Sequence, residues 1–566
     1  MRRAAVLLAA ILSVGSQMAA PTATMARTVA PAPAAAATVV PAAATHHLSA
    51  EVVGYLPYWE MNAATFADID LTKVSSIVLF SVGWDAAGHL VTNAPGYQAI
   101  VRSDTTAFVA AAHAAGVRVL VSFTSFGLTK NTSFFSNAAV QPTFISEAAA
   151  FVAARDLDGA DLDVELISGA QFPAYAATAG ALRTRLRTAD PNALLTVATN
   201  ANVSGAKMAA QAIAAGADRA FLMGYAYRTA GSLAPGAIDP LSRTGTSLSL
   251  NASLNLYVQY GAPLNRVILG LPLYGRTWAT VDGTIGSPRR TDITAGNGDS
   301  FVFQDLATLH QPATFVAQDY VPIEEGTRLV QNVAGVFWQS FYDSQANLET
   351  KMRVVLQRQL AGAGLWALGY STGRPEYWTA IGNVFGAPTV TRLAVAPSPT
   401  NVRNVTLNLT WADHASPATE MRIANGTSAF SAWQPIAVAT PWTLPTGPTI
   451  VRRTIRVQLR DGSLAQSLIA STNVLVDQVR PTLTKLTVAW SYTARAWIIR
   501  YAGKDVGSGV GSYKIAMRRN GILRVLAYSR VSTSYALRIP HSAHFVIVVR
   551  ARDRAANLSR PLYSYH

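Results

Sequence analysis

Eight short runs of β-forming residues alternate with alanine-rich helical runs between residues 52 and 385. The predicted strands cover residues 52–58, 76–82, 118–123, 159–163, 195–199, 219–223, 267–271 and 364–368. Helices are predicted between most of them, for example over residues 105–115, 144–154 and 173–188. Alternating strands and helices are typical of a parallel sheet covered by helices. Eight such units in about 340 residues predict an α/β fold, a (β/α)8 TIM barrel over residues 49–387.

Regular alternation stops over residues 278–339, where we expect an inserted subdomain before the eighth strand. After residue 388 the sequence becomes rich in Thr, Val and Arg, with Pro and Gly turns and no helical periodicity. An internal repeat runs through this tail: Asp413, Asn425-Gly426 and Arg460-Asp461 recur as Asp505, Asn520-Gly521 and Arg552-Asp553. Two copies of about 90 residues have the size of immunoglobulin-like or fibronectin-like units. We therefore predict two all-β sandwich domains, over residues 388–478 and 479–566.

The N-terminus has the composition of an export signal. Arg2 and Arg3 precede an apolar run over residues 4–14, and small residues follow up to residue 26. The alternative is a membrane anchor, but the run is shorter than the roughly 18–20 apolar residues that a membrane span needs. We expect residues 1–26 to be a signal peptide and residues 27–48 to be an Ala/Pro/Thr-rich linker. We also expect that the chain has no transmembrane segment and that the protein is secreted. The chain has no cysteine, which excludes thiol catalysis, cysteine-ligated zinc and disulfides.

One segment concentrates acidic groups. Residues 156–166 read DLDGADLDVEL, with Asp161, Asp163 and Glu165 at alternate positions. Alternate residues of a strand share one face, about 6.5–7 Å apart, and in a barrel that face is the interior. Carboxyl groups confined together cannot all ionise easily, so at least one pKa should rise. Glu165 lies nearest the C-terminal rim, where barrel enzymes hold catalytic groups, and a protonated acid there suits general acid catalysis on a glycosidic oxygen.

Two other interpretations of this segment are a solvated acidic loop and a metal site. Apolar residues flank the carboxylates, which disfavours the loop, and no histidine lies near to support a metal. We therefore predict no metal and no cofactor.

The segment Asp158-Gly159-Ala160-Asp161-Leu162-Asp163-Val164-Glu165 resembles the DGxDxDxE signature of glycoside hydrolase family 18, the chitinase family. Segments resembling the family's first, sixth, seventh and eighth strands are Gly54-Tyr55-Leu56-Pro57-Tyr58-Trp59, Leu222-Met223-Gly224-Tyr225, Gly270-Leu271-Pro272-Leu273-Tyr274-Gly275-Arg276 and Gly364-Leu365-Trp366-Ala367-Leu368-Gly369-Tyr370. The resemblance covers about residues 50–385 and implies a hydrolase of polysaccharides that contain β-1,4-linked N-acetylglucosamine, either chitin-like or peptidoglycan.

The resemblance also implies a substrate-assisted retaining mechanism, a known exception to the scheme with two catalytic carboxylates. Glu165 would protonate the leaving oxygen, and the 2-acetamido oxygen of the substrate would attack the anomeric carbon. Asp163 would orient the acetamido group, Asp161 would tune Asp163, and Tyr225 would hydrogen-bond the acetamido carbonyl.

The remaining family positions would bind the sugar. Met223 would pack beneath the acetamido group, and Trp366 would form the floor of the subsite. The groove would be lined by Tyr55, Tyr274 and Arg276. For a single aromatic or apolar residue such as Tyr55 or Met223, core packing is the alternative.

The sequence departs from the family after Tyr225, where an aspartate is usual and Ala226 stands here. One alternative is therefore a non-catalytic sugar-binding or wall-binding protein on the same barrel. A serine hydrolase is a weaker alternative: residues 369–373 fit G-x-S-x-G, but Arg374-Pro375 follows where the helix of a nucleophile elbow would begin.

The excess of positive charge is confined to the tail. Residues 388–566 carry 22 Lys and Arg against 6 Asp and Glu, whereas residues 1–387 carry 24 against 25. Arg outnumbers Lys 39 to 7 and alanine is abundant, which is typical of bacterial genes of high GC content. A basic surface attracts anionic polymers, which outside a bacterium are wall polymers and lipid head groups; nucleic acid is not expected. The tail is therefore predicted to hold the barrel near an anionic cell-wall polymer, the alternative being arginines that only solubilise exposed strands.

Overall fold

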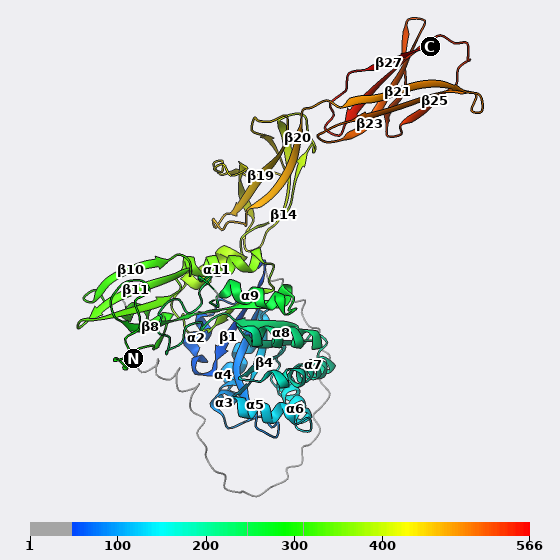
Figure 1. The fold of residues 1–566 in the computed structure, drawn as a ribbon. Coiled ribbons are helices and arrows are strands. Elements are labelled where there is room, and N and C mark those ends of the chain that lie inside the picture. The colour runs from blue at the N-terminus through cyan, green and yellow to red at the C-terminus, as the bar shows by residue number, and fades with distance from the viewer. Residues whose placement is uncertain (1–47, 246, 310) are drawn as a thin grey trace. The chain divides into compact units, whose positions relative to one another are not determined.

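The computed structural model describes residues 48–245, 247–309 and 311–566 (Figure 1). The predicted signal peptide and nearly all of the predicted linker lie outside these residues. The described part of the chain divides into two compact units, with the boundary between residues 386 and 387. In the part of the chain that the structure describes, no helix has the length and apolar character required to span a membrane.

The first unit contains a closed barrel of eight parallel strands, as predicted. In chain order the strands are β1 (Glu51–Pro57), β2 (Ser76–Gly83), β3 (Arg118–Phe126), β4 (Gly159–Glu165), β5 (Leu194–Asn200), β6 (Arg219–Met223), β7 (Val267–Pro272) and β13 (Gly362–Trp366). The last of these begins and ends two residues earlier than predicted. Its apolar run continues into a turn, in which the Tyr370 N–H donates to the Ala367 carbonyl (3.1 Å), so hydrophobicity alone misplaced the strand.

Helices surround the barrel (Figure 1). They are α2 (Ala63–Asp68), α3 (Pro95–Ile100), α4 (Ser103–Ala114), α5 (Leu128–Ser136), α6 (Gln141–Ala154), α7 (Phe172–Ala189), α8 (Val203–Ala215), α9 (Leu250–Gln259), α11 (Gln345–Gln357) and α12 (Glu376–Phe385). The three helices predicted in detail correspond to α4, α6 and α7. The first begins two residues and the second three residues before its predicted start.

Residues of the barrel strands alternate between two cores. Val52 and Leu56 of β1 pack in the large core between strands and helices, whereas Val53 and Tyr55 pack inside the barrel. The acidic strand β4 follows the same alternation: its apolar residues Ala160, Leu162 and Val164 belong to the outer core. Its carboxylates consequently face the barrel interior, as the period of two residues requires.

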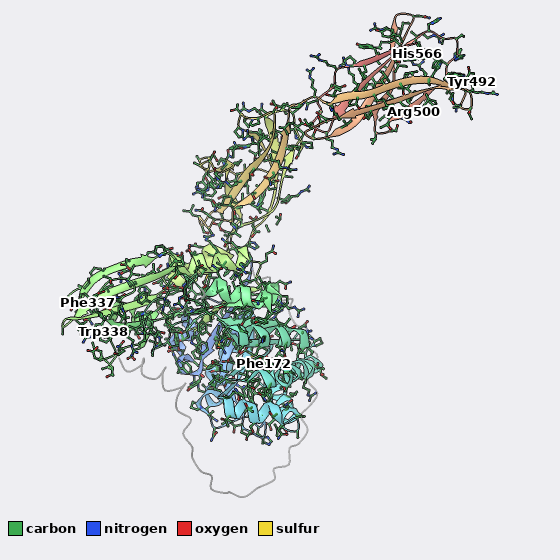
Figure 2. All side chains as sticks on the ribbon, viewed as in Figure 1. Phe172, Phe337, Trp338, Tyr492, Arg500 and His566 are labelled. Atoms are coloured by element: carbon green, nitrogen blue, oxygen red, sulfur yellow. The ribbon has the colours of Figure 1, made fainter. Side chains whose placement is uncertain are left out.

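A five-stranded antiparallel sheet lies between β7 and β13 in the chain, where an insertion was predicted. Its strands are β8 (Tyr274–Thr280), β9 (Ser300–Val302), β10 (Phe315–Val321), β11 (Gly326–Val333) and β12 (Val336–Tyr342), and the short helix α10 (Leu306–Leu309) precedes β10. Phe337 and Trp338 lie at one end of this sheet (Figure 2). The sheet therefore starts four residues before the predicted insertion, because β7 and β8 are separated only by Leu273.

The second unit contains two β-sandwiches of identical strand order. The first comprises β14 (Thr389–Ala396), β15 (Asn404–Ala412) and β18 (Ala439–Thr443) in one sheet, and β17 (Gln434–Pro435), β16 (Ala418–Asn425), β19 (Ile450–Asp461) and β20 (Ala470–Asp477) in the other. The second comprises β21 (Thr482–Ser491), β22 (Ala496–Lys504) and β25 (Ser534–Leu537), and β24 (Ile522–Arg530), β23 (Val510–Arg519), β26 (Val546–Asp553) and β27 (Leu562–Tyr565). Tyr492 and Arg500 point outward from the second sandwich (Figure 2).

The predicted repeat explains the shared topology, since Asp461 and Asp553 end equivalent strands. Each carboxylate accepts a hydrogen bond from the backbone N–H four residues later, at 2.9 Å from Ala465 and 2.8 Å from Asn557.

Three arginines alternate with two aromatic rings on one face of the first sandwich. The order of this arginine–aromatic ladder is Arg456, Phe430, Arg422, Trp433 and Arg460. Each guanidinium carbon lies 4.5–4.8 Å from the centroid of the neighbouring ring. Cation–π contacts of this kind are stabilising, so part of the tail's positive charge is used in the fold itself.

Candidate active site

The three carboxylates of β4 differ in depth inside the barrel. Asp161 is fully buried, Asp163 is 5% exposed, and Glu165 is half-buried at the C-terminal end of the strand. The alternation places them in one column, with the deepest group furthest from solvent. Glu165, the outermost, therefore lies nearest to a substrate that approaches from the rim.

Asp161 is held by hydroxyl groups from the two neighbouring strands. Ser122 on β3 donates to it at 2.8 Å and Thr196 on β5 donates at 2.6 Å. Both residues are the register partners of Asp161 in the parallel ladder. Burial raises the pKa of Asp161, and these two hydrogen bonds oppose that rise. Negative charge is therefore easier to hold at Asp161 than burial alone would allow.

Asp163 has less support. Its Oδ1 atom is buried and has no hydrogen-bond partner among the described residues. Burial raises its pKa well above the ordinary range, and the charges of Glu165 and Asp161 raise it further. Burial also raises the pKa of Glu165. The predicted rise in at least one pKa is thus confirmed, and the pair retains a proton at a higher pH than isolated carboxyl groups would.

Aromatic side chains surround the carboxylates. The rings of Tyr225 and Trp366 are stacked with centroids 6.5 Å apart, and the Tyr55 ring lies 5.9 Å from Trp366. Met223 packs against the same interior cluster as Tyr55. Burial raises the pKa of Tyr225 well above its usual range, so its phenol remains a neutral hydrogen-bond donor.

Two predicted groove residues lie further along the chain, on β8. The ring of Tyr274 is 6.3 Å from that of Tyr225 and is almost completely buried. Arg276 is half-buried, and its Nη1 donates to the Gly298 carbonyl in the inserted subdomain. Its charge opposes the rise in the pKa of Tyr274 that burial causes, and no contact among the described residues joins it to the β4 carboxylates. The structure thus brings the other predicted residues together and leaves Arg276 at their margin.

The structure also defines the surroundings of Ala226 and Ser371, the residues that suggested a non-catalytic sugar-binding protein and a serine hydrolase. Ala226 is exposed and adopts a left-handed backbone conformation, with φ of 58°. Because this residue is alanine, the position after Tyr225 carries no carboxylate. Ser371 is buried and the next helix begins only at Glu376. A serine nucleophile elbow, which requires an exposed serine directly before a helix, is therefore excluded.

Three supporting residues were not predicted. Ser122 and Thr196 could have been found from the sequence, because they face the barrel interior on strands adjacent to Asp161. Asn131 lies in α5, and its side chain donates to the backbone carbonyl of Glu165. No sequence periodicity indicates that contact.

A metal-compatible arrangement occurs in the second unit. Asp477, Asp505 and Asp553 each offer one oxygen, and these atoms lie within 4.8 Å of one another. Among the residues that the structure covers, the β4 carboxylates do not form such a group.

Comparison with known proteins agrees with this geometry. Residues 51–371 match the family described as glycosyl hydrolases family 18. The chain belongs to glycosyl hydrolases family 18. A curated relative is the "Probable endochitinase" of Caenorhabditis elegans, 30% identical over 282 residues that make up 45% of this chain and 44% of the relative. Another is "Chitotriosidase-1" of Mus musculus, 26% identical over 269 residues, which are 43% of this chain and 56% of the relative. The chain spans about half the length of these curated relatives.

Solved structures of family 18 share the fold. The Group IV chitinase of Ostrinia furnacalis, solved in complex with allosamidin, superposes with a TM-score of 0.52 at 18% identity. The superposition covers 59% of this chain and 98% of that chain. At this identity the similarity supports the fold alone.

Proposed function

We propose that this protein is a secreted glycosidase that hydrolyses a polysaccharide containing β-1,4-linked N-acetylglucosamine. The observation that carries the proposal is the column of carboxylates on β4, in which a half-buried acid with a raised pKa stands at the rim above two buried aspartates. A general acid must hold its proton near the working pH and lie within reach of the leaving oxygen. Family membership and the names of the relatives agree with this substrate class.

The proposed reaction is substrate-assisted and retains anomeric configuration. Glu165 gives its proton to the glycosidic oxygen as the bond from that oxygen to the anomeric carbon breaks. The acetamido oxygen of the substrate attacks the same carbon from the opposite face, forming an oxazolinium ion. The buried Oδ1 atom of Asp163, which has no partner among the described residues, accepts a hydrogen bond from the acetamido N–H. Tyr225 donates a hydrogen bond to the acetamido oxygen. Water then attacks the anomeric carbon and gives a proton back to Glu165.

The test compares chitin oligomers and peptidoglycan as substrates for the wild-type chain and for Glu165→Gln. Glutamine keeps the size of the side chain but has no acidic proton. We expect the wild type to release reducing ends from at least one substrate, and the variant to lose about 10²- to 10⁴-fold in rate. Equal activity of the two proteins would refute the assignment of Glu165, and the preferred polymer identifies the glycan.

A non-catalytic sugar-binding protein is the second candidate, and Ala226 is the observation that favours it. This candidate predicts that the wild type binds N-acetylglucosamine oligomers, measured by calorimetry, without releasing product over long incubation. Binding without turnover would establish it in place of the enzyme.

The second unit is proposed to hold the protein on an anionic cell-wall polymer. Its support is the charge of residues 388–566, with 22 basic against 6 acidic side chains. The full chain carrying Glu165→Gln, which leaves wall glycan intact, is mixed with isolated walls at low and high salt. We expect binding that falls as salt rises. Binding that ignores salt would contradict the role of charge, and no binding at all would remove the proposal.

A further inference from the structure

The chain turns sharply after the proposed catalytic acid. Glu165 is the last residue of β4, and the next residue, Leu166, has a left-handed backbone with φ of 61°. A left-handed conformation is unfavourable for a residue other than glycine, and it persists only where surrounding contacts fix it. Leu166 itself is 67% exposed, so packing of its side chain does not supply those contacts.

The fixing contacts come from Asn131, which is fully buried in the first turns of α5. Its Nδ2 donates to the Glu165 carbonyl at 2.6 Å and lies 3.4 Å from the Leu166 carbonyl. It also donates to the Ser125 carbonyl at 3.2 Å. One side-chain amide thus joins the carbonyls on both sides of the left-handed turn to the end of β3.

The orientation of this amide is determined by its surroundings. Carbonyl oxygens only accept hydrogen bonds, so the nitrogen must face them. The Asn131 Oδ1 atom accepts from the Ser125 hydroxyl at 2.6 Å. The helix that carries Asn131 is itself attached to the same point, since the Gly127 N–H donates to the Glu165 carbonyl at 3.3 Å.

We propose that Asn131 is a positioning residue that holds the peptide after Glu165, and through it the Glu165 carboxyl group, toward the interior beside Asp163. The inference rests on the proposed function, because it assigns Glu165 as the acid. When the amide is lost, the end of β4 relaxes, and the Glu165 carboxyl moves toward solvent while the groups that contact sugar remain in place. Misplacement of a reacting group by about 1 Å can reduce the rate about 10²-fold.

The experiment uses Asn131→Leu and Asn131→Ala in the full chain. Leucine keeps the branched shape of asparagine without a donor, whereas alanine also removes volume. We expect both variants to lose about 10- to 100-fold in kcat, with KM changed less than about twofold. The basic limb of the pH–rate profile should move to lower pH in both, because a more solvated Glu165 releases its proton more readily. Ser125→Ala, which removes only the hydroxyl bond to Oδ1, should show the same changes on a smaller scale.

The matched control is Asn347→Leu, the same change at another buried asparagine of the first unit. The Asn347 side chain accepts a hydrogen bond from the Thr327 hydroxyl at 2.6 Å and donates one to the Glu325 carboxylate at 3.1 Å. It is buried, and neither partner lies on β4. Asn347→Leu should lower the melting temperature but leave the pH limb unmoved. If Asn131→Leu keeps wild-type kcat and pH limb while Asn131→Ala does not, Asn131 acts by packing and the inference is wrong. If the wild type itself shows no turnover that depends on Glu165, the proposed function fails instead.

Discussion

The carboxylate column should make the protein less stable than it could be. The Oδ1 atom of Asp163 is buried and has no hydrogen-bond partner among the described residues. Two further carboxyl groups, those of Asp161 and Glu165, lie on the same face of β4. Leaving a buried acceptor unsatisfied costs about 1–3 kcal/mol. Asp163→Asn keeps an acceptor oxygen in the same volume, but it cannot ionise, and its amide nitrogen can donate to the neighbouring carboxylates. We expect it to raise the free energy of unfolding by about 1–3 kcal/mol near neutral pH, while lowering hydrolysis.

The gain should depend on pH in a defined direction. Because the native pKa of Asp163 is raised, the folded state holds that proton more tightly than the unfolded chain does. The stability from this proton is fully present below the unfolded pKa of about 3.9, and it is lost as the pH rises through the native pKa. The advantage of Asp163→Asn should therefore be largest at neutral pH and shrink on acidification.

Guanidinium unfolding of the full wild-type and Asp163→Asn chains at about pH 7 and about pH 4.5 measures the difference in their free energies of unfolding at each pH. Asp104→Asn is a control of opposite sign, because its exposed carboxylate has a pKa lowered by the hydrogen bond from Arg102. That variant should lose stability at neutral pH, keep nearly the same loss at about pH 4.5, and approach the wild type only below the unfolded pKa of about 3.9. A loss of stability in Asp163→Asn at neutral pH, or an advantage that grows toward acid, would refute the reasoning.

Two further predictions concern stability outside the site. Lys351 is fully buried and contacts Asp239 and Asp343, each at 2.7 Å; Lys351→Met leaves two buried carboxylates unpaired and should lower the free energy of unfolding by about 3–5 kcal/mol. Lys73→Met breaks a partly exposed pair with Asp70 and should lower the free energy of unfolding by less than about 1 kcal/mol, so equal losses would contradict the role of burial. Trp433→Ala removes two contacts of the arginine–aromatic ladder and should destabilise the second unit by about 1–2 kcal/mol; calorimetry showing an unchanged transition would mean that the ladder is not stabilising.

Much of the fold follows from periodicity. The eight barrel strands were predicted because parallel strands buried on both faces form short apolar runs between helices. The eighth strand was predicted two residues too late because its apolar run extends into the turn at Ala367–Tyr370. A buried turn and a buried strand both have apolar sequences, so hydropathy does not separate them. The start of the inserted subdomain was also misjudged, since the break between β7 and β8 is a single residue. Hydropathy does not distinguish a sharp bend from a continuing strand.

The site divides in the same way. The carboxylates of β4 were predicted because interior positions of a barrel strand repeat every second residue, whereas Tyr225, Met223 and Trp366 were assigned by resemblance to the family. Asn131 was missed because its contact depends on the path from β3 through Gly127 into α5, which no pattern in the sequence encodes. Arg276 was assigned to the groove by resemblance, and the hydrogen bond from its guanidinium to the Gly298 carbonyl was not predicted. Contacts made by loops and insertions depend on three-dimensional paths rather than on local periodicity.

Depth along β4 explains why three similar groups can have different roles. Asp161 lies deepest, yet two hydroxyl donors make its negative charge tolerable. Among the described residues the Oδ1 atom of Asp163 has no donor, and burial and the neighbouring carboxylates raise its pKa well above the ordinary range, so a substrate N–H could supply the hydrogen bond that this oxygen lacks. Glu165 is near enough to solvent to exchange its proton and buried enough to keep it. Moving the strand by one residue would turn all three groups into the apolar outer core, so the register of the barrel sets both the fold and the order of the acids.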